Sequence, residues 1–120
     1  MGDPKILLSR NGLRVTIGYV DGQNQVVLDA PGGQKVTLGA DPSLIHVDDG
    51  NGNTVRLDVS GISVTSPGAV TVNASHVTIA AAEVTVDAGL VAFSGVVRAD
   101  SVIANSVVSA SYSPGAGNIW

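Results

Sequence analysis

Apolar side chains recur at a fixed interval along the second half of the chain. Four consecutive segments of seven residues each carry an apolar pair separated by one residue, and the pairs are Val70 and Val72, Val77 and Ile79, Val84 and Val86, and Val91 and Phe93. An alternation of this kind has the period of a β-strand. Because seven is odd, a straight strand would turn successive pairs to opposite faces. Keeping every pair on one side requires a bend in each repeat, which predicts a β-structure that winds forward without reversing.

The repeat becomes shorter near residue 96. Val97, Val102 and Val107 follow one another at intervals of five residues, with small side chains at Ala99 and Ala104 beside them. A shorter step built from smaller residues indicates a narrower cross-section. We therefore expect the structure to taper toward its C-terminus.

The first 68 residues show a different pattern, in which short strands alternate with strong turn signals. Glycine and asparagine supply the backbone conformations that tight turns need, and they stand at Asn11-Gly12, Asp21-Gly22, Pro31-Gly32-Gly33, Asp41-Pro42 and 49–53. The strands expected here are 5–8, 14–20, 25–29, 35–38, 44–47, 54–58 and 62–65, with a hairpin joining 14–20 to 25–29. Further strands are expected at 70–73, 77–80, 84–87, 91–94, 96–99, 102–104 and 107–109. Residues 69–88 contain no Gly or Pro, which disfavours an antiparallel meander there.

Composition narrows the class of protein. Hydrophobic residues make up 44% of the chain but aromatic residues only 3%, so any core consists of many small contacts. The net charge of −4 argues against nucleic acid and against anionic membrane surfaces as partners. Twelve of the sixteen charged residues lie in 1–58, and the second half holds only Glu83, Asp87, Arg98 and Asp100.

Several kinds of chemistry find no support in the residues. There is no cysteine, hence no disulfide or thiolate chemistry. His46 and His76 are the only histidines, and we interpret both as surface or turn positions. The alternate oxygen side chains of Asp49, Asn51 and Asn53 resemble part of a calcium loop but lack its bidentate glutamate, which favours a solvated turn. We expect no catalytic residue, no cofactor and no metal site.

Oligomeric state follows from the amount of core that one chain can enclose. Three heptads would make one coil of a single-chain solenoid, and stacked repeats of about three coils or more are needed to bury a continuous core. Three chains wound around one axis would each provide a wall and pair their edges with the other two. The predicted fold is therefore all-β, an intertwined homotrimeric β-helix with a prism-like outline that tapers to the C-terminus. The predicted trimer core consists of Val70, Val72, Val77, Ile79, Val84, Val86, Val91, Phe93, Val97, Val102 and Val107.

The stretch QKVTLGADPSLIHVDDGNGNTVRLDVSGISVTSPGAVTVNASHVTIAAAEVTV, residues 34–86, resembles the β-helical region of VgrG proteins and of the phage baseplate assembly protein V family. The shared pattern is a Gly52-Asn53 turn, a short strand, a Gly61-Ile62 start and alternating Val/Ile heptads. The resemblance implies the central spike of a contractile injection machine, such as a phage tail, a type VI secretion system or a tail-like particle. It also implies a hub, baseplate and tube as partners, transient contact with a target membrane, and a PAAR-type protein at the tip. Family members usually carry an oligonucleotide-binding-like barrel before the β-helix, and residues 1–33 are too short for one.

The domain division expected from this reading is an N-terminal β segment with a hairpin (1–33), a β-helical shaft (34–110) and a tip segment (111–120). The tip segment SYSPGAGNIW leaves the repeat, and it either folds back or docks the tip protein through Tyr112, Pro114, Ile119 and Trp120. The N-terminus lacks a secretory signal, so we expect assembly in the cytoplasm and delivery outside within a virion or injection particle.

Two alternatives remain open from sequence. The chain could form the shaft or receptor-binding segment of a trimeric tail fibre or adhesin, because valine–threonine repeats occur there too. An enzyme of the solenoid acyltransferase or tailspike kind is disfavoured, because the only carboxylates between Val59 and Arg98 are Glu83 and Asp87, which lie at or near bends.

Overall fold

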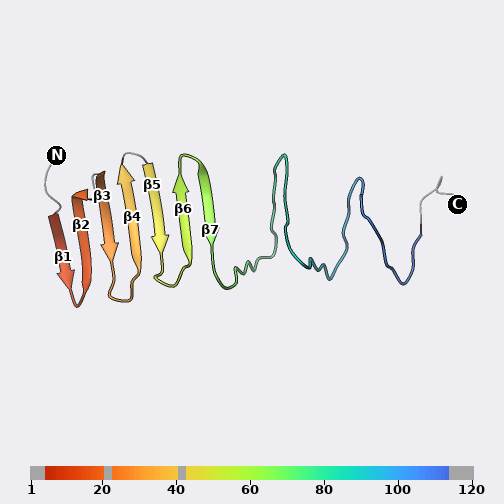
Figure 1. The fold of residues 1–120 in the computed structure, drawn as a ribbon, viewed down its shortest axis with the longest axis horizontal. Coiled ribbons are helices and arrows are strands. Elements are labelled where there is room, and N and C mark those ends of the chain that lie inside the picture. The colour runs from red at the N-terminus through yellow and green to blue at the C-terminus, as the bar shows by residue number, and fades with distance from the viewer. Residues whose placement is uncertain (1–4, 21–22, 41–42, 114–120) are drawn as a thin grey trace. The chain divides into compact units, whose positions relative to one another are not determined.

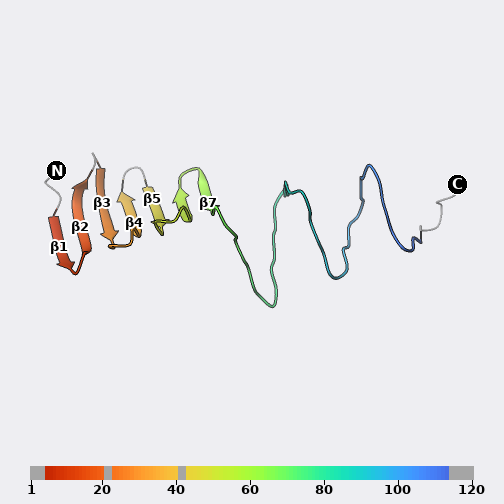
Figure 2. The ribbon, with the colours of Figure 1, turned by 60° about the horizontal axis from the view of Figure 1, so that its bottom comes forward.

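Seven strands between residues 5 and 65 form one antiparallel sheet in which each strand pairs with its neighbours along the chain (Figure 1). The computed structural model describes residues 5–20, 23–40 and 43–113, and none of these lies in a helix. The strands are β1 (Lys5–Arg10), β2 (Leu13–Val20), β3 (Gln23–Asp29), β4 (Lys35–Ala40), β5 (Ser43–Asp48), β6 (Thr54–Asp58) and β7 (Gly61–Thr65). The order β1-β2-β3-β4-β5-β6-β7 is also followed in the turned view of Figure 2. The protein is all-β, as the sequence predicts.

The seven strands expected in the first 68 residues are all present, and most are longer by one or two residues at an end. The expected hairpin is confirmed: β2 pairs with β3 from Arg14 opposite Asp29 to Val20 opposite Gln23. Its two turn residues, Asp21 and Gly22, lie outside the described residues. The meander ends at Thr65, in agreement with the disfavoured reversals further along the chain.

Local turn chemistry explains where the strands reverse. Asn11 and Gly12 both have positive φ, 53° and 84°, and they connect the paired residues Arg10 and Leu13. Two consecutive positive φ values define the type I′ turn that fits the twist of a two-residue hairpin, and Asn-Gly is the sequence that favours it. Gly50, in the turn between β5 and β6, also has a positive φ of 82°. These positions therefore need glycine or asparagine for a conformational reason.

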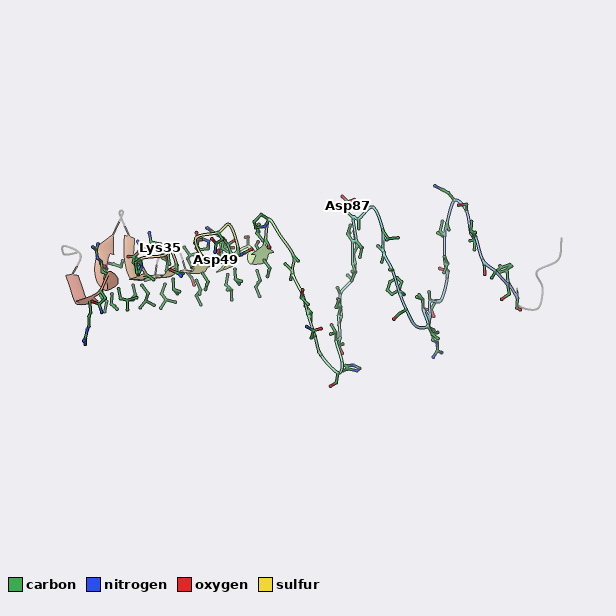
Figure 3. All side chains as sticks on the ribbon, turned by 90° about the horizontal axis from the view of Figure 1, so that it is seen from below. Lys35, Asp49 and Asp87 are labelled. Atoms are coloured by element: carbon green, nitrogen blue, oxygen red, sulfur yellow. The ribbon has the colours of Figure 1, made fainter. Side chains whose placement is uncertain are left out.

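The register aligns apolar side chains into two unbroken rows across the sheet. Because side chains alternate between faces along a strand, residues that are paired or two apart share a face. One row is Val15, Leu28, Val36, Val47, Val55 and Val64, and the other is Ile17, Val26, Leu38, Ile45, Leu57 and Ile62. We call these twelve residues the apolar face. Figure 3 shows the sheet with a line of side chains that contain only carbon on one of its sides.

The opposite face of the sheet is mostly polar. Its central row is Thr16, Val27, Thr37, His46, Arg56 and Ser63. A second row begins with charges of alternating sign on neighbouring strands, Arg14, Asp29, Lys35 and Asp48. Opposite charges across strands contribute little at an exposed surface but disfavour a shifted register. The sheet is thus two-sided, and its polar side is the one suited to water.

From Ser66 to Ser113 the backbone winds without forming a strand. It bends at Ser75, Ala82 and Gly89, which are seven residues apart, and then at Gly95, Asp100, Asn105 and Ala110, which are five apart. The predicted bend in every repeat and the shorter later step are both present. None of the backbone-to-backbone hydrogen bonds in the described structure joins two residues between 66 and 111. The expected strands from residue 70 onward are therefore not formed within one chain, because a strand needs a partner for its N–H and C=O groups.

The chain divides into two units, Met1–Val77 and Thr78–Trp120. The predicted boundary between residues 33 and 34 falls within continuous pairing, since β3 and β4 on its two sides form one antiparallel pair. The predicted three-part division of the chain stays a prediction about the assembled protein.

The contact between two turns provides a test of this fold. A Cβ added to Gly50 would lie 2.9 Å from the Gly32 carbonyl oxygen and 3.0 Å from the Gly33 carbonyl carbon, and Gly50 has a positive φ. Gly50→Ala is therefore expected to destabilise the protein by about 1–3 kcal/mol, measured by thermal or urea unfolding. The matched control is Gly32→Ala, where the added Cβ meets only the flexible Gln34 side chain. Equal losses from the two substitutions would contradict the proposed turn contact.

Candidate functional site

The principal feature of the sheet is its apolar face, most of which is exposed among the described residues. Among the side chains that the structure describes, only Val27 is buried, at 5% exposed, and it lies on the opposite face. Eight of the twelve residues of the apolar face are 37–72% exposed. Complete burial of one Val, Leu or Ile contributes about 1.5–3 kcal/mol; because these eight side chains are on average about half exposed, roughly 6–12 kcal/mol of this burial free energy is not realised per chain. This amount is comparable with the net stability of a whole domain, about 5–15 kcal/mol, so the face is a candidate interaction surface.

Two grooves lie along one row of this face. The larger, about 520 Å³, is lined by Leu13, Val15, Leu28 and Val36, with Arg10, Arg14 and Lys35 among the remaining residues around it. The second, about 320 Å³, is formed by Val47, Val55 and Val64 and extends to Ala69 and Val70. The row of the sheet is thereby continuous with the first residue of the predicted trimer core. Apolar surfaces of this extent mark interaction sites in proteins.

The predicted core residues of the heptads are not covered within one chain. Val70, Val72, Val77, Ile79, Val84, Val86, Val91 and Phe93 are 48–72% exposed. In the pentads the positions assigned inward are less exposed than their neighbours: Val102 is 76% exposed whereas Ile103 is 99% exposed. Val97 and Val107 likewise are less exposed than Val96 and Val108. The predicted core residues are therefore exposed within one chain, and their burial in a common core stays a prediction.

The predicted tip residues are only partly described. Tyr112 is exposed and lines an open groove of about 320 Å³ with Val107 and Ser109. Pro114, Ile119 and Trp120 lie outside the described residues. Docking of a tip protein through these residues stays a prediction.

The turn at 49–53 uses its oxygen atoms to hold itself together. Oδ1 of Asp49 accepts from the backbone N–H of Asn51 at 2.8 Å and of Asn53 at 3.1 Å, and Oδ2 accepts from the Asn53 side-chain amide at 2.6 Å. These hydrogen bonds, led by the Asn53 side chain, lower the pKa of Asp49 to about 2. Because the carboxylate is occupied by its own turn, the partial likeness to a calcium loop has a structural explanation.

The same turn is connected to the start of the winding segment. Ser66 Oγ donates to Asn53 Oδ1 at 2.6 Å, and the backbone N–H of Gly68 donates to Ser66 Oγ at 3.1 Å. Pro67 packs against Gly52, where an added Cβ would lie 3.2 Å from Pro67 Cγ. We call these contacts the exit latch, because they hold the chain as it leaves β7.

The remaining candidate groups do not converge on a site. His46 lies on the polar face between Thr37 and Arg56 of the neighbouring strands, and His76 is exposed next to the bend at Ser75. Asp58 accepts hydrogen bonds from Ser60 and from Arg56 Nε, at 2.8 Å for the latter, and these bonds lower its pKa. Within the described ranges, no three His, Cys, Asp or Glu side chains are grouped so as to hold a metal ion. Asp87 lies by a bend of the winding segment (Figure 3).

The apolar face was missed as a core by the sequence interpretation, although a signal for it exists. Each of β2 to β7 carries two apolar residues separated by one, as in Val15-Thr16-Ile17 and Ile45-His46-Val47, and this is the same triplet that begins every heptad. Its interval varies from strand to strand because the connecting turns differ in length. The register of pairing, which reveals the two rows, could not be derived from a fixed repeat.

No family model and no curated protein matches this chain. The described part of the chain also contains no helix that is long and apolar enough to cross a membrane. Two structural features therefore bear on function. They are the exposed apolar face and the winding segment, whose described residues form no backbone ladder within the chain.

Acid should loosen the turn at 49–53. Folding lowers the pKa of Asp49 from 3.8 to about 2, so the stability that this carboxylate contributes is complete above 3.8 and is lost as the pH falls through about 2. Titration of the Asp49 carboxyl carbon by NMR should give a midpoint near 2. Asp49→Asn should reduce the loss of thermal stability on acidification, whereas Asp87→Asn, outside the turn, should leave that loss unchanged. A midpoint at the ordinary aspartate value would contradict the turn geometry.

Proposed function

We propose that this protein is the central spike of a contractile injection machine, a homotrimer that pierces the target envelope and carries a tip protein. The observation that carries the proposal is the combination of an apolar face without cover and a winding segment without internal backbone pairing. Copies of the same chain would cover the apolar face and would pair with the backbone N–H and C=O groups of the winding segment. We assign the protein no catalytic role.

The absence of self-pairing favours an intertwined assembly over a single-chain solenoid. In a single-chain solenoid, successive coils of one chain would lie about 4.8 Å apart and bond to each other. Between residues 66 and 111 the described chain has no such bonds. Strands from other copies would fill the space between its turns and satisfy the open N–H and C=O groups, as buried backbone requires.

The spacing of the bends supports three walls and a taper. Bends at Ser75, Ala82 and Gly89 divide the chain into equal short segments, each with an apolar pair separated by one residue. Three such segments, one from each copy, would enclose an axis where the small β-branched side chains meet. The later interval of five residues would draw the walls inward toward the C-terminus. The proposed fold is therefore a trimeric β-helix that narrows along its length.

A mechanical role is consistent with this construction. Interchain backbone ladders on all three sides would resist bending and unfolding when a contracting sheath pushes the spike. Residues 59–120 hold only four charged side chains, and Ile103 and Val108 are 99% and 98% exposed. A surface with few charges lowers the free energy of passage through lipid. The proposed partners are the hub, baseplate and tube of the same machine, a PAAR-type tip protein and, transiently, the target membrane. The proposed location is a virion or an injection particle assembled in the cytoplasm.

The oligomeric state is the first test of the proposal. Sedimentation and light scattering are expected to report three chains, each of 12.0 kDa, with no dissociation on dilution. The reason is that, in the trimer, each copy would bury apolar surface of its neighbours that stays exposed in a single chain. A monomer with native strand content would overturn the proposed spike.

Binding of a tip protein is the second test. A pull-down with a small conical PAAR-type protein is expected to succeed with the full chain and to fail when Ser111–Trp120 is deleted. A deletion variant that remains trimeric shows that lost binding arises from the tip segment itself. A trimer that binds no tip protein but binds target cells would instead favour the shaft of a tail fibre or adhesin.

A further inference from the structure

The two parts of the chain differ in where their backbone hydrogen bonds come from. Each of the seven strands is paired within the chain, through ladders between sequence neighbours. The segment from Ser66 onward has no comparable ladder among the described residues. The sheet can therefore form its backbone ladders inside one copy, whereas the winding segment would need other copies to form a backbone ladder.

This difference sets an order of events. Pairing between neighbouring strands has low contact order, and such contacts form quickly because only short loops are closed. Once its strands are paired, the sheet exposes a preformed apolar face, which then only has to be buried against another surface. The winding segment cannot be ordered earlier, since fixing its backbone without hydrogen-bonded partners costs conformational entropy with no compensating gain.

The exit latch fixes the start of the winding segment relative to the sheet. Ser66 is tied to Asn53 at 2.6 Å, Gly68 is tied to Ser66, and the second groove joins Val64 to Ala69 and Val70. The first heptad residue is thus placed next to a fixed row of the apolar face. Three sheets joined by that face would deliver three winding segments to the axis at the same level.

We infer that the apolar face of β2–β7 is the primary contact between copies, that it assembles first and sets the register, and that residues 70–113 wind together afterwards on the trimer so formed. This inference rests on the proposed trimer and adds to it an order of assembly. The occupant of the apolar face is a second copy of the chain. Its row of Val, Leu and Ile carries no charge, so it offers no complementary group for a charged ligand.

Two single-charge substitutions in the full chain separate the two parts. Ile45→Asp introduces a charge into the apolar face, and Val84→Asp introduces one into the heptads. The matched controls are His46→Asp, on the opposite face of the same strand, and Thr78→Asp, at the polar position of the preceding heptad. The measurements are sedimentation for the number of chains and hydrogen exchange for protection along the chain.

Val84→Asp is expected to remain trimeric, with slow exchange in β2–β7 and at least tenfold faster exchange beyond residue 84. Ile45→Asp is expected to lose the trimer and protection throughout residues 70–113, and both controls should behave as the unsubstituted protein. Pulse labelling during refolding should protect β2–β7 before the heptads, a result that does not require any variant to fold. A monomeric Val84→Asp, a trimeric Ile45→Asp, or simultaneous protection of both parts would overturn the inference. If the unsubstituted chain is itself not trimeric, the proposed function fails instead.

Discussion

The exposed apolar face of the sheet is the constraint on which the rest of this structure depends. The sheet arranges Val, Leu and Ile in two rows that run across β2–β7, and most of these side chains remain exposed within a single chain. The polar face opposite, with its alternating Arg14, Asp29, Lys35 and Asp48, is already suited to water. A domain of this size normally encloses its own core, and with only Val27 buried among the described side chains this one does not. The proposed trimer would supply the missing cover from other copies of the chain.

Backbone hydrogen bonding changes at Thr65, and the change has a local origin. Up to that point the chain carries Gly, Asn and Pro at the turns, and each hairpin closes on its neighbour. Beyond the exit latch, residues 69–88 contain no Gly or Pro, and bends replace reversals. The backbone N–H and C=O groups of this segment form no ladder among the described residues, and the side chains of the apolar face are exposed. Strands from another chain could pair with these backbone groups and could also cover the apolar face. The proposed association of copies would meet both needs, from the sheet to the pentads.

The turn at 49–53 links these two regimes. Asp49 orders the turn by accepting hydrogen bonds from Asn51 and Asn53, Asn53 in turn accepts from Ser66, and Ser66 accepts from Gly68. Residues that resemble a cation loop in sequence therefore serve to position the exit from the last strand. Their oxygen atoms form a series of hydrogen bonds within the protein. The spacing that resembles a calcium-binding loop therefore has a structural role.

The sequence alone determined the all-β class, the positions of the seven strands and the intervals of the bends. These features depend on local rules: alternation for strands, Asn-Gly and related pairs for reversals, and an odd repeat length that forces a bend, as Val70, Val77 and Val84 illustrate. Only the tertiary structure decided which residues share a face. Val15 and Val64 lie in one row because the register of five successive pairings places them there, and turns of unequal length hide that relation from any fixed repeat. The heptad valines follow the predicted spacing of the bends, but they are exposed within one chain, so their place in a shared core stays a prediction that neither the sequence nor the fold of one chain decides.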